Sequence, residues 1–342
     1  MSRRNGIIIA LLFVILVIEI VIVAPKELGT SVADDLAAAK RARESSRAAK
    51  NSDKGQSGQV MNDVHLVEAA GEGKEWELWA DRALRPKDKE QWTIEKVKVH
   101  FFADNGVMYT VTGDRGQVVP EKKDIRIDGN VVTRSTNGYV FKTQSVDYNS
   151  KARKLDSPNA VEMIGPKDQS GGELRLNGGA LMAEFDTNLI SITKGVRAKR
   201  KVNVGKDQVP KTANIQANRA EFSGKTNEAN FYGDVVIDVE TMQLAGPQAK
   251  FAYDAKSQML NSVKIAGGAK VSDTDKFATS GVVDLFFKED RVVFSGSPRV
   301  VQNGDELVGD EIVLMDGGKK VQVSNAKAQL DPERSSETGT KQ

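Results

Sequence analysis

Few residues in this chain of 342 amino acids have the types and spacing that catalysis requires. The chain has two histidines, His65 and His100, which lie in different segments, and it has no cysteine. Without cysteine it can form no disulfide framework, no CxxC redox motif and no cysteine-based zinc site. A Ser-His-Asp triad stays open, but the sequence has no GxSxG motif. The reactive residue types therefore give no positive sign of an active site.

Three short motifs are similar to sites for nucleotides, calcium or acid–base catalysis, and each is incomplete. Residues 223–226 (SGKT) match the end of a phosphate-binding loop, but Arg219 stands at the required first glycine. Residues 273–278 (DTDKFA) begin like a calcium loop, then place Phe and Ala where a ligand and the turn glycine are needed. Asp310 and Glu311 would point to opposite faces of a strand, which suits solvent better than paired acid–base work. We therefore expect no enzyme, no cofactor and no metal site.

The overall charge gives no sign of nucleic-acid binding. Lys and Arg total 49 and Asp and Glu total 47, so the formal net charge is only +2. Binding to nucleic acid usually needs a clustered basic face, and the basic residues are spread along this chain. We expect no nucleic-acid partner.

An apolar run near the N-terminus predicts a membrane anchor. Residues 7–24 hold one charge and would span roughly 27 Å as a helix, close to the hydrocarbon thickness of a bilayer. Arg3 and Arg4 precede the run, so the positive-inside rule places residues 1–6 in the cytoplasm and the rest outside. A cleavable signal peptide is the alternative, but no A-x-A site follows the run before Pro25. We predict an uncleaved, single-pass transmembrane helix.

Glu19, the one charged residue of the anchor, has two possible roles, and the segment after the anchor is predicted to be a spacer. Glu19 either contacts a partner's transmembrane helix or is a side chain that snorkels or is protonated near the interface. Residues 25–59 are predicted to be a linker, part of which has the Ala, Lys, Arg and Glu content of a short helix. That part has no wide apolar face, and the end of the linker is typical of a flexible spacer.

From about residue 60 the chain has the pattern of an all-β, antiparallel protein. Period-two alternation is interrupted by Asp, Gly and Asn, as at Ile125, Ile127 and the turn predicted at 128–130, which is the pattern of repeated hairpins. No long amphipathic helix separates these segments, so a βαβ fold is excluded. The other stretches with a strand pattern are 92–102, 139–148, 173–176, 188–193, 234–239, 260–267, 281–287, 291–294 and 310–315.

An internal repeat supports this reading. A pattern of two small or β-branched residues three apart, followed two residues later by a bulky apolar one, recurs at steps of 29 to 37 residues. Its copies begin at 113, 143, 180, 217, 246, 280 and 309, with a weaker copy at 80–83. One such unit cannot bury its apolar face alone, whereas stacked units can, and the stack leaves unpaired edge strands at its ends. A β-sandwich or solenoid whose repeats only build a core remains the plain alternative.

The order of these features resembles the LptC family, the membrane-anchored periplasmic component of lipopolysaccharide export. The resemblance rests on the anchor, the linker, ADRA at 80–83, DGNV at 128–131 and YVFKTQSVDY at 139–148. The later part resembles the soluble relative LptA, of the OstA-like type. Its motifs are 217–222 (ANRAEF), 232–236 (YGDVV), 244–249 (LAGPQA) and 251–253 (FAY). The chain is longer than a usual LptC, so the stoichiometry of any bridge is open.

The resemblance implies a fold, a location and partners. The fold would be an open, V-shaped antiparallel β-jelly-roll behind the transmembrane helix, with an LptC-like module at 60–165, an LptA/OstA-like module at 173–330 and a disordered tail at 331–342. The protein would sit in the inner membrane with its bulk in the periplasm. It would bind lipopolysaccharide in an apolar groove and pass it from an inner-membrane ABC transporter complex of the Lpt type toward the outer membrane. An LptA-like bridge protein or the outer-membrane assembly would join through edge strands.

Alternation suggests which apolar residues would face such a groove, although ordinary core packing predicts the same inward positions. The candidates are Phe101, Tyr109, Ile125, Ile127, Tyr139, Phe141, Tyr148, Phe185, Phe222, Phe251, Phe277, Leu285 and Phe294. Two other classes of function stay open. An anchored envelope scaffold that binds protein partners by β-strand addition would have a filled core and no lipid-sized cleft. A polysaccharide-processing enzyme would have clustered carboxylates on one exposed face.

Overall fold

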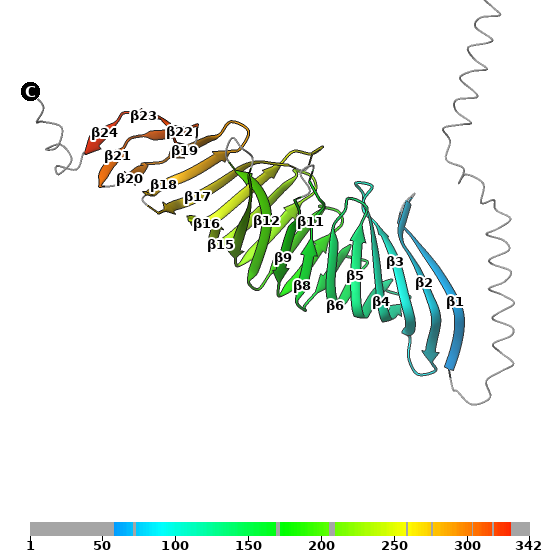
Figure 1. Cartoon of the computed structure of the whole chain (residues 1–342). Helices are drawn as coiled ribbons and strands as arrows, with labels where there is room; N and C mark the ends of the chain where they lie inside the picture. The colour runs from blue at the N-terminus through cyan, green and yellow to red at the C-terminus, as the bar shows by residue number, and fades with distance from the viewer. Residues whose placement is uncertain are drawn as a thin grey trace, which may run out of the picture. The chain divides into compact units, whose positions relative to one another are not determined.

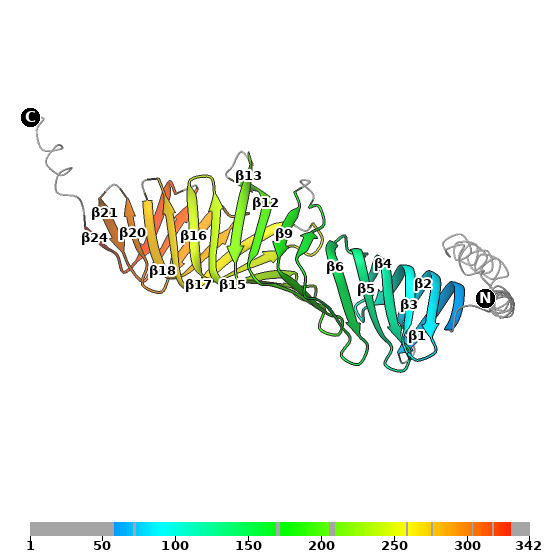
Figure 2. The ribbon, with the colours of Figure 1, turned by 90° about the horizontal axis from the view of Figure 1, so that it is seen from below.

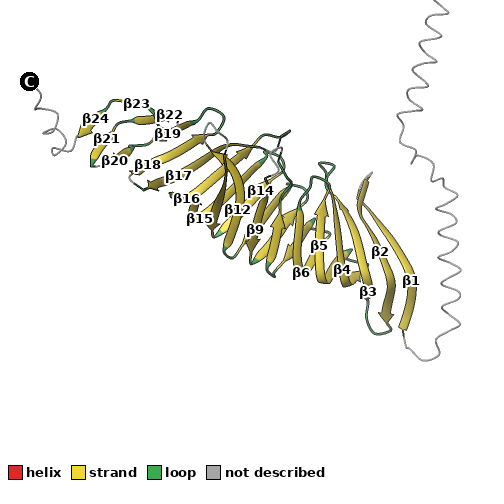
Figure 3. Cartoon of the chain, in the orientation of Figure 1, coloured by secondary structure: helices red, strands yellow, loops and turns green. Residues whose placement is uncertain are grey.

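The computed structural model describes residues 58–70, 73–168, 172–204, 209–257, 259–274, 276–302, 304–316 and 318–329. The chain divides into two compact units, Met1–Asn62 and Asp63–Gln342, and the account below concerns the second. Every element among the described residues is a strand, as Figure 3 shows, and from β2 onward neighbouring strands pair antiparallel. The all-β, antiparallel prediction is confirmed.

Two groups of long strands alternate along the chain with two groups of shorter ones. The long strands of the first half are β1 (Gly58–Ala70), β2 (Gly73–Pro86), β3 (Trp92–Phe102), β4 (Met108–Val119), β5 (Asp124–Ser135) and β6 (Val140–Asn149). The long strands of the second half are β15 (Glu228–Val239), β16 (Met242–Tyr253), β17 (Leu260–Asp273) and β18 (Lys276–Phe286).

The shorter strands lie between β6 and β15 and after β18 (Figure 1). The first group is β7 (Lys154–Ser157), β8 (Val161–Ile164), β9 (Leu174–Gly178), β10 (Ala180–Glu184), β11 (Leu189–Thr193), β12 (Val196–Val204), β13 (Val209–Ala217) and β14 (Arg219–Ser223). The second group is β19 (Arg291–Ser295), β20 (Arg299–Gln302), β21 (Asp305–Val308), β22 (Glu311–Met315), β23 (Lys320–Ser324) and β24 (Lys327–Gln329).

The pairing register resolves the strands into two ladders. Ladder A runs from the first half of β6 through β8, β9, β12 and β13 to the second half of β15. Ladder B runs from the second half of β6 through β7, β10, β11 and β14 to the first half of β15. The other long strands take part in both ladders. After β18, ladder A continues through β20, β21 and β24, and ladder B through β19, β22 and β23. Figure 2 shows β9, β12, β13 and β15 of ladder A side by side.

The long strands β5, β15 and β17 change ladder at a bulge. The register of β5 with β6 shifts between Asp128 and Val131, and the register of β15 with β16 shifts between Tyr232 and Val235. Such bulges bend a strand, and here they lie where the chain takes positive φ, at Gly129 (+84°) and the residue after it. The hairpin turn predicted at 128–130 is therefore wrong. The Asp-Gly-Asn sequence bends one continuous strand, because its neighbours on both sides stay paired.

The segment between β8 and β9 does not interrupt the sheet. Val161–Ile164 of β8 pairs with Arg175–Gly178 of β9, and the β7–β10 pairing continues ladder B across the same stretch. No helix within the described residues is long and apolar enough to cross a membrane. The predicted anchor at 7–24, the linker up to residue 57 and the tail at 331–342 lie outside the described residues. The predicted linker end at 59 is wrong by two residues, because β1 begins at Gly58.

Candidate functional site in the interior between the ladders

The register lines up apolar side chains in rows that face the space between the ladders. In ladder B, a deep row near the bends is buried from end to end, and a middle row lies two residues closer to the strand ends. The deep row contains Ile127, Val146, Leu181, Ile192, Ala220, Phe231, Ala249, Ile265, Val283, Phe294 and Ile312. The middle row contains Ile125, Tyr148, Leu155, Ala183, Ile190, Phe222, Ala229, Phe251, Val263, Leu285, Val292, Leu314 and Val321. Buried Ser157 stands between Val146 and Leu181 in the deep row, so the continuous apolar lining is that of the middle row.

The middle row loses its cover toward the C-terminal end. Val263 in β17 is 5% exposed, Leu285 in β18 is half-buried, and Val321 in the last strand of ladder B is 52% exposed. Ladder A has the same trend, since Leu244 is buried whereas its register neighbour Val271 is half-buried. The interior is therefore filled near β3–β6, whereas beyond β18 the deep row stays buried and the middle row is exposed.

Four aromatic rings fill the interior at the N-terminal end. Phe101 and Tyr109 of ladder A meet Tyr148 and Phe185 of ladder B, and all four are buried. The ring centroids of Phe101 and Tyr148 are 4.5 Å apart, and those of Phe185 lie 5.8 Å from Phe101, 5.4 Å from Tyr109 and 5.8 Å from Tyr148. Such pairs add roughly 0.5–1.5 kcal/mol each beyond area burial. The sequence analysis named all four residues, and the structure brings them together.

Polar contacts also join the ladders at this end. Glu75 of β2 is buried, and its Oε1 accepts hydrogen bonds from the Tyr148 hydroxyl (2.6 Å) and the Ser150 hydroxyl (2.6 Å). Burial, reinforced by the bond to Glu75, raises the pKa of Tyr148 well above its usual range, so this hydroxyl keeps its proton. Arg153, which follows β6, pairs with Asp104, which follows β3, at 2.8 Å. We call the Glu75, Tyr148 and Ser150 contacts the latch.

An apolar pocket of about 310 Å³ lies between the ladders beside this cluster. Phe141 and Thr133 line it from ladder A, and Leu181 and Ala183 line it from ladder B. The remaining lining residues are Tyr109, Leu155, Phe185 and Ile190. The pocket therefore joins apolar side chains of the two ladders beside the aromatic cluster.

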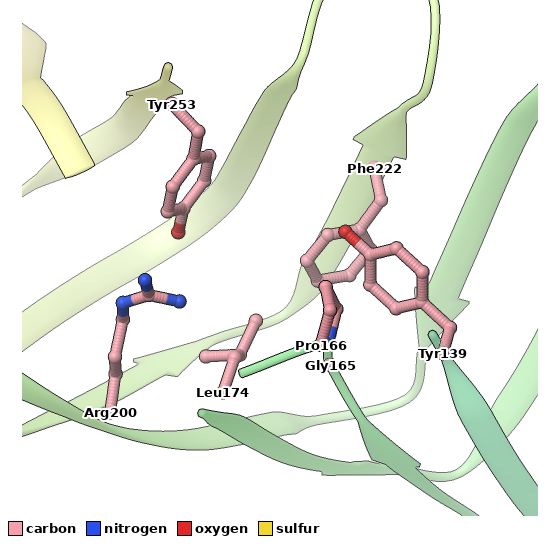
Figure 4. Close-up of a pocket in the computed structure, with 7 residues that line it drawn as sticks. All are labelled: Tyr139, Gly165, Pro166, Leu174, Arg200, Phe222 and Tyr253. Carbon is pink, nitrogen blue, oxygen red and sulfur yellow. The ribbon is translucent and has the colours of Figure 1, made fainter. Parts of the chain in front are cut away.

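A second pocket of about 330 Å³ contains a charge (Figure 4). Arg200 of β12 and Tyr139 enter it from ladder A, and Phe222 and Tyr253 enter it from ladder B. The Arg200 guanidinium carbon lies 5.0 Å from the centre of the Tyr253 ring, and a guanidinium nitrogen is 3.0 Å from Asp168. Burial raises the pKa of Tyr253 to about 12 although the guanidinium acts in the opposite direction.

The other predicted groove residues fall into three groups. Phe222 and Phe251 are both buried and meet through Phe231, whose ring centroid lies 6.3 Å and 5.2 Å from theirs. Tyr139 stacks on Phe141 at 6.3 Å. Ile125, Ile127 and Phe294 are buried members of the ladder B rows, and Leu285 is the half-buried member described above.

Phe277 has a different position. It is 39% exposed, and it pairs with Ser272 and Val301, whereas its neighbour Ala278 is 5% exposed and pairs with Val271. Since successive residues of a strand point to opposite faces, Phe277 lies on the outer face. Lipid contact by any of the thirteen residues stays a prediction.

Sequence reasoning missed the polar residues of the interior. Glu75, Asp168 and Arg200 carry charges that alternation alone would assign to solvent. Arg200 stands in the basic run RAKRK at 197–201. Its two-residue spacing from Ala198, which puts both on the same face of the strand, was the one sign that it points inward. Tyr253 closes the quoted FAY motif, two residues after Phe251.

Glu19 lies outside the described residues, so its predicted role is a prediction still. Within the part of the chain that the structure describes, no group of three or more His, Asp or Glu side chains could hold a metal ion.

Comparison with known families assigns most of the chain. Residues 36–201 match a model described as "Lipopolysaccharide-assembly, LptC-related", and residues 214–330 match one described as "LptA/(LptD N-terminal domain) LPS transport protein". The two matches follow one another in the order that the resemblance implies.

Comparison with curated proteins finds no match. Among solved structures, the chain is similar to LptH from Pseudomonas aeruginosa, the LptA homologous periplasmic component of the conserved lipopolysaccharide transport device. The identity is 22%, the match covers 35% of this chain and 95% of LptH, and the TM-score is 0.32. At this TM-score the assignment rests on the family models. The chain carries an LptC-related segment at 36–201 continued by an LptA/LptD N-terminal-type segment at 214–330.

Proposed function

We propose that this protein is a component of a periplasmic lipopolysaccharide transport bridge, and that the lipid's acyl chains lie between ladders A and B. The observation that carries the proposal is the continuous apolar lining. Its middle row extends without a break from β5, within the LptC-related segment, to β22, within the LptA-type segment.

The energetics favour a continuous lining over a closed pocket. Each buried methylene contributes about 0.8 kcal/mol, so a multi-chain lipid cannot cross water bare. Rows of apolar side chains at similar depth give non-directional cover, because no single contact differs much from the next. A chain held in this way can slide along the rows toward the C-terminal end, where the middle row is exposed at Val321.

Loading of the N-terminal end requires the ladders to separate. The pocket beside Phe141 leaves little space, and four aromatic rings and the latch occupy the interior around it. An acyl chain would displace these cross-ladder contacts and replace them with its own. In this account the filled interior is the lipid-free state of an open, V-shaped jelly-roll.

Location and partners follow from the families and the sequence. Residues 7–24 would anchor the chain in the inner membrane and place residues 25–342 in the periplasm, with modules near 60–165 and 173–330. The chain would take lipopolysaccharide from an inner-membrane ABC transporter complex of the Lpt type. It would pass the lipid on through the exposed edges of β23 and β24 to an LptA-like protein or the outer-membrane assembly. Glu19 would contact a transmembrane helix of the transporter.

A second candidate is an anchored scaffold that binds protein partners by strand addition. The filled interior between β3 and β6 favours it, since a scaffold needs a core and no lipid-sized cleft. The exposed part of the middle row beyond β18 favours the lipid bridge. For an enzyme, the described residues offer no group of three or more His, Asp or Glu side chains that could hold a metal ion.

Photo-crosslinking in cells tests the proposal. A photoreactive residue would replace Phe141 or Phe251, with the exposed Lys151 and the outer-face Phe277 as controls. We expect adducts that carry lipopolysaccharide at Phe141 and Phe251 and none at the two controls. Protein adducts without lipid at all four positions would refute the bridge and favour the scaffold.

A further inference from the structure

The ion pair of Arg200 and Asp168 stands apart from the surface ion pairs of the protein. Both side chains are 7% exposed, whereas the Lys142–Glu162 pair on the outer face is 52% and 37% exposed. A buried ion pair is weak evidence for stability, because desolvation of the two charges offsets their attraction, and apolar residues of similar volume are often as stable. The guanidinium in this interior therefore calls for an explanation other than stability.

Arg200 lies one row closer to the end of β12 than Ala198 does. Its register partners are Leu174 and Ala213, and the pairings of Val202 and Val204 continue beyond it to the end of the strand. Two residues deeper, Ala198 is 2% exposed and pairs with Leu176 and Ile215. An amphiphile with its chains against that deeper row would have its polar head at the level of Arg200.

The groups around the pocket suit an anion. A guanidinium offers a planar fork of donors that matches carboxylate and phosphate oxygens. In Figure 4 the Tyr253 hydroxyl and the Arg200 guanidinium point toward each other from opposite ladders. Burial raises the pKa of Tyr139 as it does that of Tyr253, so both hydroxyls keep their protons and can donate.

We propose that the pocket formed by Arg200, Tyr253 and Tyr139 binds the phosphate group of an amphiphile whose hydrocarbon chains lie between the ladders, with the phosphate replacing the Asp168 carboxylate on Arg200. The proposal rests on the proposed function and names the group that this part of the interior recognises. A carboxylate ligand would gain little, since Asp168 already supplies one. A phosphate monoester carries up to two charges and three strong acceptor oxygens, so it can hold Arg200 and a tyrosine hydroxyl together.

The test compares two lipids on the full chain purified in detergent. The probes are lipid A with its two phosphates and the same lipid after both phosphates are removed. We expect the wild type to bind the phosphorylated form about tenfold more tightly, the effect of one charge-assisted contact. Arg200→Gln should bring the ratio of the two affinities to about one and leave the affinity for the dephosphorylated form unchanged. Arg200→Lys should retain part of the preference for the phosphorylated form.

Asp168→Asn is the matched variant that should increase the affinity for the phosphorylated lipid. It removes the competing charge and keeps the Oδ1 acceptor for the Gly172 amide, which is 2.8 Å away. We expect several-fold tighter binding of the phosphorylated lipid together with lower stability, a combination that misfolding does not produce. Millimolar inorganic phosphate should not displace the phosphorylated lipid. If inorganic phosphate displaced it as well as unlabelled lipid does, the pocket would recognise free phosphate and not a lipid headgroup.

Two results separate the proposals. An unchanged ratio in Arg200→Gln and Asp168→Asn would overturn the phosphate site while leaving the bridge intact. Failure of the wild type to bind either lipid would refute the proposed function itself.

Discussion

The latch makes a prediction whose size follows from its geometry. Tyr148→Phe removes the hydroxyl that donates to Glu75 at 2.6 Å but keeps the ring that packs 4.5 Å from Phe101. The buried Glu75 would then retain the Ser150 hydroxyl as its donor. Loss of a hydrogen bond to a buried acidic group costs about 1.5–3 kcal/mol. Ser150→Ala should cost a similar or smaller amount, and the double variant should deviate from additivity, since both donors share one oxygen atom.

The chain contains its own probe for this measurement. Its three tryptophans are Trp76, Trp79 and Trp92, all in β2 and β3. Tryptophan fluorescence during urea unfolding therefore reports on the strands that Glu75 belongs to. With an m value of about 3 kcal/mol/M, the midpoint of Tyr148→Phe should fall by roughly 0.5–1 M. An unchanged midpoint in Tyr148→Phe, with a large loss in Tyr148→Ala, would show that only the ring matters and would refute the latch.

Three further predictions concern packing, the bends and pH. Phe231→Ala should lose about 3–5 kcal/mol in urea unfolding, because the ring is 1% exposed; a loss below about 1 kcal/mol would contradict its place in the core. Gly246→Ala should cost about 1–3 kcal/mol, since a Cβ there would lie 2.5 Å from Cγ2 of Ile265, and Ile265→Leu should restore part of it. Burial, then the charge of Lys98, lowers the pKa of His100, so the unfolded chain binds more protons and stability should fall as the pH drops through 6.5. His100→Gln should flatten that part of the pH profile, and an unchanged profile would refute the assignment.

Sequence alone predicted the fold class and most of the interior. Period-two alternation placed Phe101, Tyr109, Tyr148 and Phe185 on inward faces, and in the structure their rings meet. The glycine positions showed where each repeat changes direction, but they did not show whether the chain turns or bulges there. A turn and a bulge use the same residues at positive φ, so Asp-Gly-Asn at 128–130 could not reveal whether the next strand starts anew or continues.

The charged interior could not be predicted because it depends on contacts between distant segments. Glu75 is stabilised by Tyr148 and Ser150, more than seventy residues away, and Arg200 by Asp168, 32 residues away. Phe277 was predicted to face inward but lies on the outer face, because alternation in β18 gives the inner position to its neighbour Ala278. At the start of a strand, an aromatic residue does not by itself show which face of the sheet it occupies.

The central claim, that lipid chains lie between the two ladders, is tested most directly by joining the ladders covalently. The chain has no cysteine, so introduced cysteines react without background. Thr133→Cys and Ala183→Cys line the apolar pocket from opposite ladders, and Lys142→Cys with Glu162→Cys forms a control pair across neighbouring strands of ladder A. After treatment with a short cleavable crosslinker, the account predicts that the first pair loses lipopolysaccharide binding and regains it on cleavage, while the control pair binds throughout. Equal binding by both crosslinked proteins would contradict it.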